Sequence, residues 1–217
     1  MINLTILVLA GCLLAGLLAA EKNERRGRIL AFKTPLSILF VVAVVLQPHP
    51  LPSYYHLLLV GLVLGLIGDV SLALPGERAF MVGLVSFLAG HILYVIAFTI
   101  LTRPSDWMSL GHLVILGISA GIFFRLRPYL GKMLVPVVLY IIVITVMLGA
   151  ALAASRNPQV NAVAAWVLFL GALCFYLSDL FVARDRFIVH RFINRLVGLP
   201  LYYCGQFLLA FSVGLIG

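Results

Sequence analysis

Long apolar stretches alternate with short polar ones along all 217 residues of the chain. A transmembrane helix needs about 20 mostly apolar residues, within a range of about 17–25. This requirement predicts spans at about 2–20, 29–47, 55–74, 79–101, 107–124, 133–154, 160–182 and 196–216. The second span is the least regular, because Lys33 and Pro35 interrupt its start. The expected fold is an all-α bundle of eight transmembrane helices, with residues 1–217 forming a single transmembrane domain.

Composition also indicates a polytopic integral membrane protein. Hydrophobic residues make up 64% of the chain and charged residues 10%, whereas a soluble domain is about 45–50% apolar and about 25% charged. The net charge of +8 does not indicate nucleic-acid binding, because the basic residues form short clusters between the apolar stretches. The expected partner is therefore the lipid bilayer, and no nucleic acid.

The basic residues are distributed unequally between the predicted loops. The first, third, fifth and seventh loops with their flanks hold 13 of the 15 Lys and Arg residues, whereas the even-numbered loops hold only Arg103 and Arg156. Cytoplasmic loops are the ones enriched in Lys and Arg. We therefore expect a protein of the cell (inner) membrane, with the odd-numbered loops in the cytoplasm and both termini outside.

Two of the seven acidic residues, Asp69 and Asp179, lie within predicted spans. A charged side chain at a helix centre costs about 2.5–3.5 kcal/mol on insertion scales, so intramembrane carboxylates generally serve a function. Asp69 precedes Pro75 by six residues and Asp179 precedes Arg184 by five. At about 1.5 Å per residue, both lie roughly 8–9 Å from the cytoplasmic helix ends. The two carboxylates are therefore expected to share one site, the alternative being protonated groups that serve only packing.

Other polar residues of the spans fall in the same half of the predicted bilayer. His91 and Tyr94 lie on one face of the fourth predicted helix, and Tyr202 and Gln206 are four residues apart on the eighth. We expect a polar cavity among the third, fourth, seventh and eighth helices that opens toward the cytoplasm. Interhelical hydrogen bonding is the simpler alternative for His91. Snorkelling toward the membrane surface is the more natural interpretation of Lys33.

Glycines lie next to both aspartates along the helix. Gly61, Gly65 and Asp69 repeat at intervals of four residues, and Gly171 lies two helical turns before Asp179. Small residues at this spacing allow a second helix to approach closely. The pattern predicts close helix contacts beside each carboxylate.

No motif of metal-dependent or serine hydrolysis is present. The chain has no H-x-x-x-H, H-E-x-x-H or G-x-S-x-G sequence, and catalytic zinc needs three protein ligands. Its three cysteines show no C-x-x-C spacing and are interpreted as small core residues. No metal or cofactor is expected. A carboxylate pair in a cavity of low dielectric constant can supply an acid and a base together, which suits a reaction through an oxocarbenium ion and equally a proton-coupled transporter.

Four sequence motifs resemble those of the YhhN family of lysoplasmalogenases, and the resemblance covers nearly the whole chain. The motifs are "GDVSL" (68–72), "GLVSFLAGHILYVIAF" (83–98), "GALCFYLSD" (171–179) and "YYCGQFLLA" (202–210). The resemblance implies hydrolysis of the vinyl-ether bond of lysoplasmalogens to a fatty aldehyde and glycerophosphocholine or glycerophosphoethanolamine. It also implies that Asp69 and Asp179 are the catalytic acids.

The same resemblance implies a set of residues around the catalytic acids. These site-lining residues would be His91, Tyr94, Ser178, Tyr202, Tyr203 and Gln206. The family often has Lys-Pro in the second helix, whereas this chain has "KTP" at 33–35. A place for Lys33 in the site is therefore an open alternative to snorkelling. A proton-coupled transporter and a non-catalytic lipid-binding protein are the alternatives to a hydrolase.

Overall fold

The computed structural model describes residues 2–216, and its regular structure is entirely helical over that range. The α-helices are α1 (Ile2–Lys22), α2 (Arg26–Val45), α3 (Pro52–Ala73), α4 (Glu77–Thr99), α5 (Leu110–Leu130), α6 (Leu134–Arg156), α7 (Ala162–Ala183) and α8 (Phe192–Ser212). Short helical turns follow or link them: η1 (Pro104–Trp107), η2 (Gly131–Met133), η3 (Arg184–Ile188) and η4 (Val213–Leu215). The predicted spans lie at the same positions, with ends that differ by a few residues, because the helices continue beyond their apolar parts.

Seven helical segments of residues 2–216 are long and apolar enough to cross a membrane, as expected for an integral membrane protein. Six of them correspond to α1 to α4 and to α7 and α8 with their adjoining turns. The seventh, Leu110–Arg156, is 47 residues long and contains both α5 and α6. The prediction of eight separate spans is therefore not matched in number. Within this segment, Gly131 has a positive φ of 47°, which favours glycine, and it separates the two helices.

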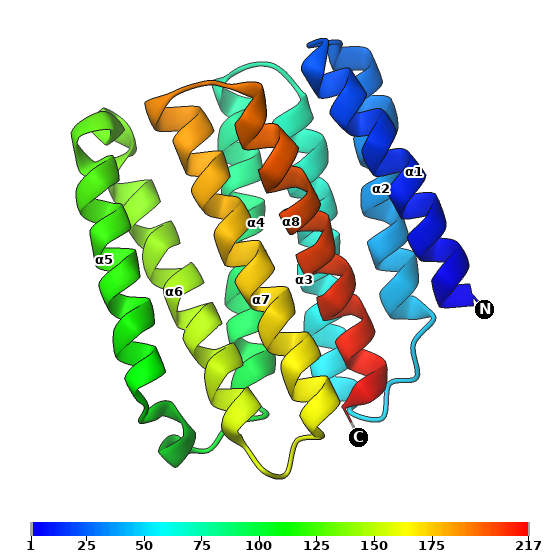
Figure 1. Cartoon of the computed structure of the whole chain (residues 1–217), viewed down its shortest axis with the longest axis vertical. Helices are drawn as coiled ribbons and strands as arrows, with labels where there is room; N and C mark the ends of the chain where they lie inside the picture. The colour runs from blue at the N-terminus through cyan, green and yellow to red at the C-terminus, as the bar shows by residue number, and fades with distance from the viewer. Residues whose placement is uncertain (1, 217) are drawn as a thin grey trace.

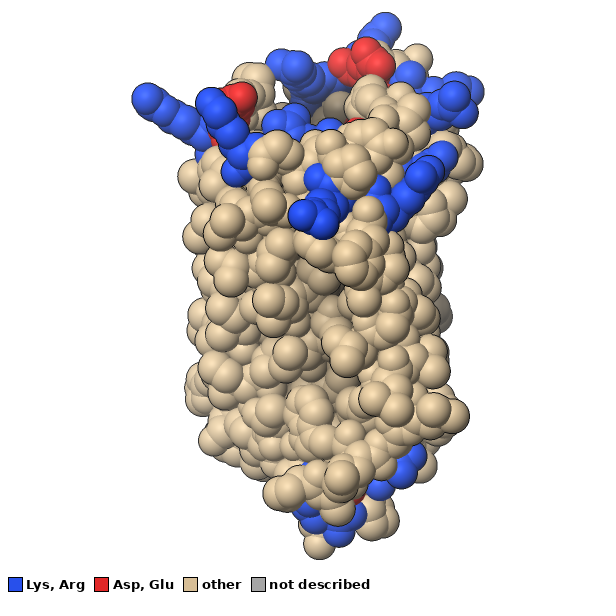
Figure 2. Space-filling model, turned by 90° about the vertical axis from the view of Figure 1, so that its left-hand side faces the viewer, with Lys and Arg blue, Asp and Glu red and all other residues tan. Residues whose placement is uncertain are grey.

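The helices stand side by side and successive helices run in opposite directions, with both termini at the same end of the bundle (Figure 1). Lys and Arg side chains gather mainly at the opposite end, and the middle of the face in view carries none (Figure 2). The end without the termini carries the odd-numbered loops and is called the basic end below. The segregation of charge predicted from the loops is therefore present in the folded molecule.

Close helix contacts form where the glycine spacing predicts them. A Cβ atom on Gly61 would collide with the Tyr94 ring of α4, and one on Gly65 would lie 2.7 Å from Nε2 of Gln206 in α8. The most extensive helix contacts within the bundle are α3 against α4 and α7 against α8. These four helices hold most of the residues that the sequence assigns to the site.

The three cysteines do not lie in the core, contrary to the prediction from the sequence. Cys12 and Cys204 are exposed and Cys174 is partly buried. A cysteine behaves as a small apolar side chain, so in a membrane protein an outward-facing position in an apolar span suits it as well as a position in the core.

Candidate active site

A cavity of about 910 Å³ lies within the bundle and extends to the basic end. It is lined by residues of all eight helices and of the first, third and seventh loops. The helices predicted from the sequence, α3, α4, α7 and α8, all contribute. Two polar side chains from other helices also reach it: Lys33 on α2, which the sequence offered as an alternative site residue, and Tyr140 on α6, which it did not.

Asp69 lines this cavity from α3 and is surrounded by hydrogen-bond donors. The Lys33 ammonium lies 3.0 Å from Oδ1. The hydroxyls of Ser37 and Tyr202 donate to Oδ2 at 2.6 Å and 2.7 Å. The Lys33 side chain is only 6% exposed and that of Asp69 only 2%. Lys33 is therefore a buried partner of Asp69, and the interpretation as a snorkelling side chain is wrong.

Asp179 lines the same cavity from α7, with different surroundings. The Tyr140 hydroxyl donates to Oδ2 at 2.9 Å. Nε2 of His91 is 3.9 Å from the same oxygen, which is beyond hydrogen-bond distance. Within residues 2–216, no lysine or arginine forms an ion pair with this carboxyl group.

The two aspartates share a cavity but do not bind each other. Among the described residues, no hydrogen bond joins the carboxyl groups of Asp69 and Asp179, and each has its own partners. A substrate group placed between them would face one carboxyl group from α3 and the other from α7. Their action as a catalytic pair remains a prediction.

Hydrogen bonds connect three of the predicted site residues to Asp69. The Tyr94 hydroxyl on α4 donates to Oε1 of Gln206 at 3.0 Å, and Nε2 of Gln206 donates to the Tyr202 hydroxyl at 3.0 Å. Tyr202 in turn donates to Asp69. Tyr202 lines the cavity, whereas Tyr94 and Gln206 are buried in the helix packing behind it. Gln206 thus links Tyr94 to the Tyr202 hydroxyl through hydrogen bonds.

The remaining predicted residues differ in their relation to the cavity. Ser178 lines it, but its hydroxyl donates to the Gly198 carbonyl at 3.0 Å and so joins α7 to α8. Tyr203 is buried, with its hydroxyl 3.2 Å from that of Ser37. His91 is buried, its ring 4.5 Å from that of Phe175, and neither ring nitrogen has a hydrogen-bond partner among residues 2–216. The simpler interpretation of His91, as an interhelical hydrogen-bond donor, is therefore not supported.

Two residues in contact with the aspartates were missed at the sequence level. Ser37 lies four residues after Lys33, so both fall on one face of α2, and this spacing could have indicated it. Tyr140 is six residues into α6 from the basic end, a depth similar to that of Asp179. Because tyrosine is common near membrane interfaces, Tyr140 does not stand out in the sequence.

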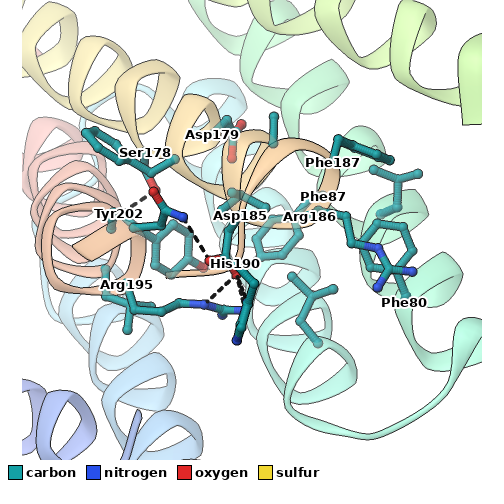
Figure 3. A pocket seen from close by; sticks show the side chains of 18 of the residues that line it. Phe80, Phe87, Ser178, Asp179, Asp185, Arg186, Phe187, His190, Arg195 and Tyr202 are labelled. Carbon is teal, nitrogen blue, oxygen red and sulfur yellow. Dashed lines mark hydrogen bonds and ion pairs between the residues drawn. The ribbon is translucent and has the colours of Figure 1, made fainter. Parts of the chain in front are cut away.

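A charged cluster centred on Asp185 lies at the mouth of the cavity. Its carboxylate accepts from Nε and Nη2 of Arg195 at 3.1 Å and 2.9 Å, and from Nδ2 of Asn194 at 3.0 Å. Nδ1 of His190 is 3.1 Å away. Figure 3 shows the Arg195 and His190 side chains meeting at Asp185. Asp185 follows the seventh predicted span and lies in the π-helical turn η3, a kind of irregularity often found at functional sites.

A second basic side chain at the mouth is held by an aromatic ring. The Arg186 guanidinium lies 4.3 Å from the centre of the Phe80 ring, an arrangement visible in Figure 3. Lys22, Arg26 and Arg191 also line the cavity. The acidic residues Glu21, Glu24 and Glu77 line it too, so the mouth carries charges of both signs, with the basic ones in slight excess. Within the described range 2–216, no three His, Cys, Asp or Glu side chains are arranged to hold a metal ion.

Comparison with known proteins places the sequence of this chain in a family. The YhhN family model matches residues 28–213. Lysoplasmalogenase TMEM86B of Rattus norvegicus is 31% identical over 175 residues, which cover 81% of this chain and 67% of the rat protein. The Homo sapiens TMEM86B is 30% identical over 174 residues, 75% of this chain and 66% of the human protein.

A related protein with a different name matches to a similar extent. Lysoplasmalogenase TMEM86A of Bos taurus is 32% identical over 157 residues, 70% of this chain and 63% of the bovine protein. The chain thus spans about two thirds of the length of these curated relatives. No solved structure is significantly similar to it. Because the family model matches most of the chain, including both Asp69 and Asp179, this chain belongs to the YhhN family.

Proposed function

We propose that this protein is a membrane-embedded lysoplasmalogenase. It would hydrolyse the vinyl-ether bond of a lysoplasmalogen, giving a fatty aldehyde and glycerophosphocholine or glycerophosphoethanolamine. The observation that carries the proposal is the pair of intramembrane aspartates, Asp69 and Asp179, on the wall of one cavity open at the basic end. Relatives named lysoplasmalogenase, which are about 30% identical, support it.

The proposed reaction needs only water and the two carboxyl groups. A protonated carboxyl group gives its proton to the vinyl carbon remote from the ether oxygen, which leaves an oxocarbenium ion. The other group, ionised, stabilises this cation and takes a proton from the attacking water, and a hemiacetal forms. Return of a proton to the glycerol oxygen and loss of the hydroxyl proton then break the carbon–oxygen bond and release the aldehyde.

The shape and charge of the cavity suit a lysophospholipid that enters from the basic end. Lys22, Arg26 and Arg191 at the mouth would attract the phosphate. Both aspartates lie about 8–9 Å deeper along their helices, a depth suited to the ether bond of a substrate whose phosphate stays at the mouth. The alkenyl chain would lie among the apolar side chains of the bundle, such as Leu84 and Ile144.

We further propose that the whole chain is one transmembrane domain of eight crossings. The segment Leu110–Arg156 would be about 70 Å long as a straight helix, more than twice the bilayer core of about 30 Å. The break at Gly131 and the side-by-side course of α5 and α6 favour two crossings (Figure 1). The positive-inside rule then supports a cytoplasmic basic end and outer termini in the cell membrane.

Aldehyde release by purified protein in detergent micelles tests the proposed activity. Asp69→Asn and Asp179→Asn should each lose most turnover, whereas Asp106→Asn, at the opposite end of the bundle, should keep it. Turnover in micelles, where no proton gradient exists, would also distinguish a hydrolase from a proton-coupled transporter. Wild-type protein that binds a lysoplasmalogen without releasing aldehyde would refute the hydrolase. Near wild-type turnover of either folded active-site variant would refute the catalytic role of the aspartate pair.

A further inference from the structure

The two aspartates have surroundings of different charge, although the sequence presents them as equivalents. We infer that Asp69 is ionised and Asp179 protonated in the resting protein, so that Asp179 is the proton donor and Asp69 is the carboxylate that stabilises the cation. This assignment rests on the proposed function for its chemical meaning, whereas the charge difference itself is a property of the free protein.

The contacts of Asp69 match an ionised carboxylate. An ammonium group has three donors and no acceptor, so Lys33 at 3.0 Å from Oδ1 can only donate. The hydroxyls of Ser37 and Tyr202 both lie within 2.7 Å of Oδ2 and are oriented as donors. These donors come from two helices, α2 and α8, and converge on a group that is 2% exposed. A buried lysine and a buried carboxylate in contact are stable together as an ion pair, since either charge alone would be costly.

The contacts of Asp179 match a neutral carboxylic acid. Its one hydrogen bond within residues 2–216 comes from the Tyr140 hydroxyl, which carries no charge. His91, the other polar group facing it, is 3.9 Å away and is itself 1% exposed. A carboxylate that is largely buried and has no cation beside it carries a desolvation cost, and taking up a proton removes that cost. The group is nevertheless open to the cavity, because its side chain is 16% exposed and lines the wall.

This difference assigns one role to each group in vinyl-ether hydrolysis. Transfer of the Asp179 proton to the vinyl carbon leaves a carboxylate at Asp179 and a cation on the substrate. Asp69 already carries the negative charge that stabilises this cation, and it accepts a proton from the attacking water. Lys33, Ser37 and Tyr202 act through Asp69 and are therefore positioning residues.

Infrared spectroscopy of the resting protein tests the charges directly. A protonated carboxylic acid has a carbonyl-stretch band that shifts in D₂O, and dodecyl maltoside micelles add no carbonyl signal of their own. At neutral pH the wild-type protein should show such a band. It should be lost in Asp179→Asn and retained in both Asp69→Asn and the control Asp106→Asn, whose carboxylate pairs with Arg103. A band lost in Asp69→Asn but retained in Asp179→Asn would overturn the assignment, as would its absence from the wild type.

Milder substitutions keep the test decisive if an aspartate variant does not fold. Tyr140→Phe removes one hydroxyl and should shift the band by loss of the hydrogen bond to Asp179. Lys33→Met removes the cation beside Asp69 and should create a second band, whereas Lys33→Arg should not. An unshifted band in Tyr140→Phe, or an unchanged spectrum in Lys33→Met, would contradict the inference.

The spectra require no substrate, so they separate this inference from the proposed activity. The predicted bands in a protein that releases no aldehyde would uphold the charge difference and refute only the hydrolase. Aldehyde release with the bands assigned in the opposite order would uphold the hydrolase and overturn the inference.

Discussion

The contact between α7 and α8 at Gly205 leaves no room for a side chain. A Cβ atom there would lie 2.9 Å from the Gly171 carbonyl oxygen and 3.0 Å from the Phe175 backbone nitrogen. Both neighbours are backbone atoms of a regular helix and cannot rotate away. Since heavy atoms in contact prefer a separation of about 3.5 Å or more, Gly205→Ala must push α8 away from α7 by about 0.6 Å.

This displacement affects both stability and the site. Overpacking of this kind costs about 1–3 kcal/mol, which on the scale of soluble domains of similar size lowers the thermal midpoint by about 2–12 °C. Tyr202 lies one helical turn before Gly205, and its hydroxyl is 2.7 Å from Asp69. A shift of about 0.6 Å along the direction of this bond, in either sense, would take its length outside the usual range. We expect turnover to fall about tenfold, given that a displacement of about 1 Å can cost about a hundredfold.

Gly117 provides the matched control, because it lies on α5 with nothing within 4 Å of its added Cβ. Gly117→Ala should be neutral or should stabilise by up to about 1 kcal/mol through helix propensity. The assays are thermal unfolding followed by tryptophan fluorescence and aldehyde release, both in detergent. A midpoint of Gly205→Ala equal to or above that of Gly117→Ala would refute the close packing of α7 on α8 at Gly205.

Three other substitutions probe the site and its mouth. Tyr202→Phe removes one hydrogen bond to the Asp69 carboxylate, worth about 1.5–3 kcal/mol, so kcat should fall about 10- to 150-fold; a loss below threefold would contradict this role. Lys33→Met should reduce kcat more than Lys33→Arg, because only arginine retains a cation beside Asp69; equal losses would show that the charge is unimportant. Asp185→Asn should cost about 1 kcal/mol, a small value because Arg195 is 37% exposed and screened by water; a thermal midpoint that stays at the wild-type value would refute it.

The sequence predicts the depth of the two aspartates in the bundle but not their hydrogen-bond partners. The depths of Asp69 and Asp179 followed from their distance to the helix ends, and both aspartates do line one cavity. Their separate partners could not be foreseen, because helical periodicity shows which residues share a face but not which helix that face meets. Tyr140 is an example: only the packing of α6 against α7 brings its hydroxyl to Asp179.

The sequence by itself determined where the helices lie and which end of the bundle is basic. Both depend on local properties, the apolar length needed to cross a bilayer and the placement of Lys and Arg in loops. It also determined that other helices approach α3 closely at Gly61 and Gly65, since glycine has no side chain to hold them apart. The sequence did not determine the number of membrane-crossing segments in the same way, because α5 and α6 adjoin in one apolar helical segment of 47 residues.

Only the tertiary structure decided the electrostatics of the site. A lysine near a helix end can extend its ammonium to the membrane surface or turn it inward, and the sequence pattern is the same in both cases. The packing of α2 against α3 turns Lys33 toward Asp69, and no helix brings a comparable cation to Asp179 among the described residues. Because Coulomb energies in a site of low dielectric constant depend steeply on distance and burial, the difference between the two aspartates arises from the packing of the helices.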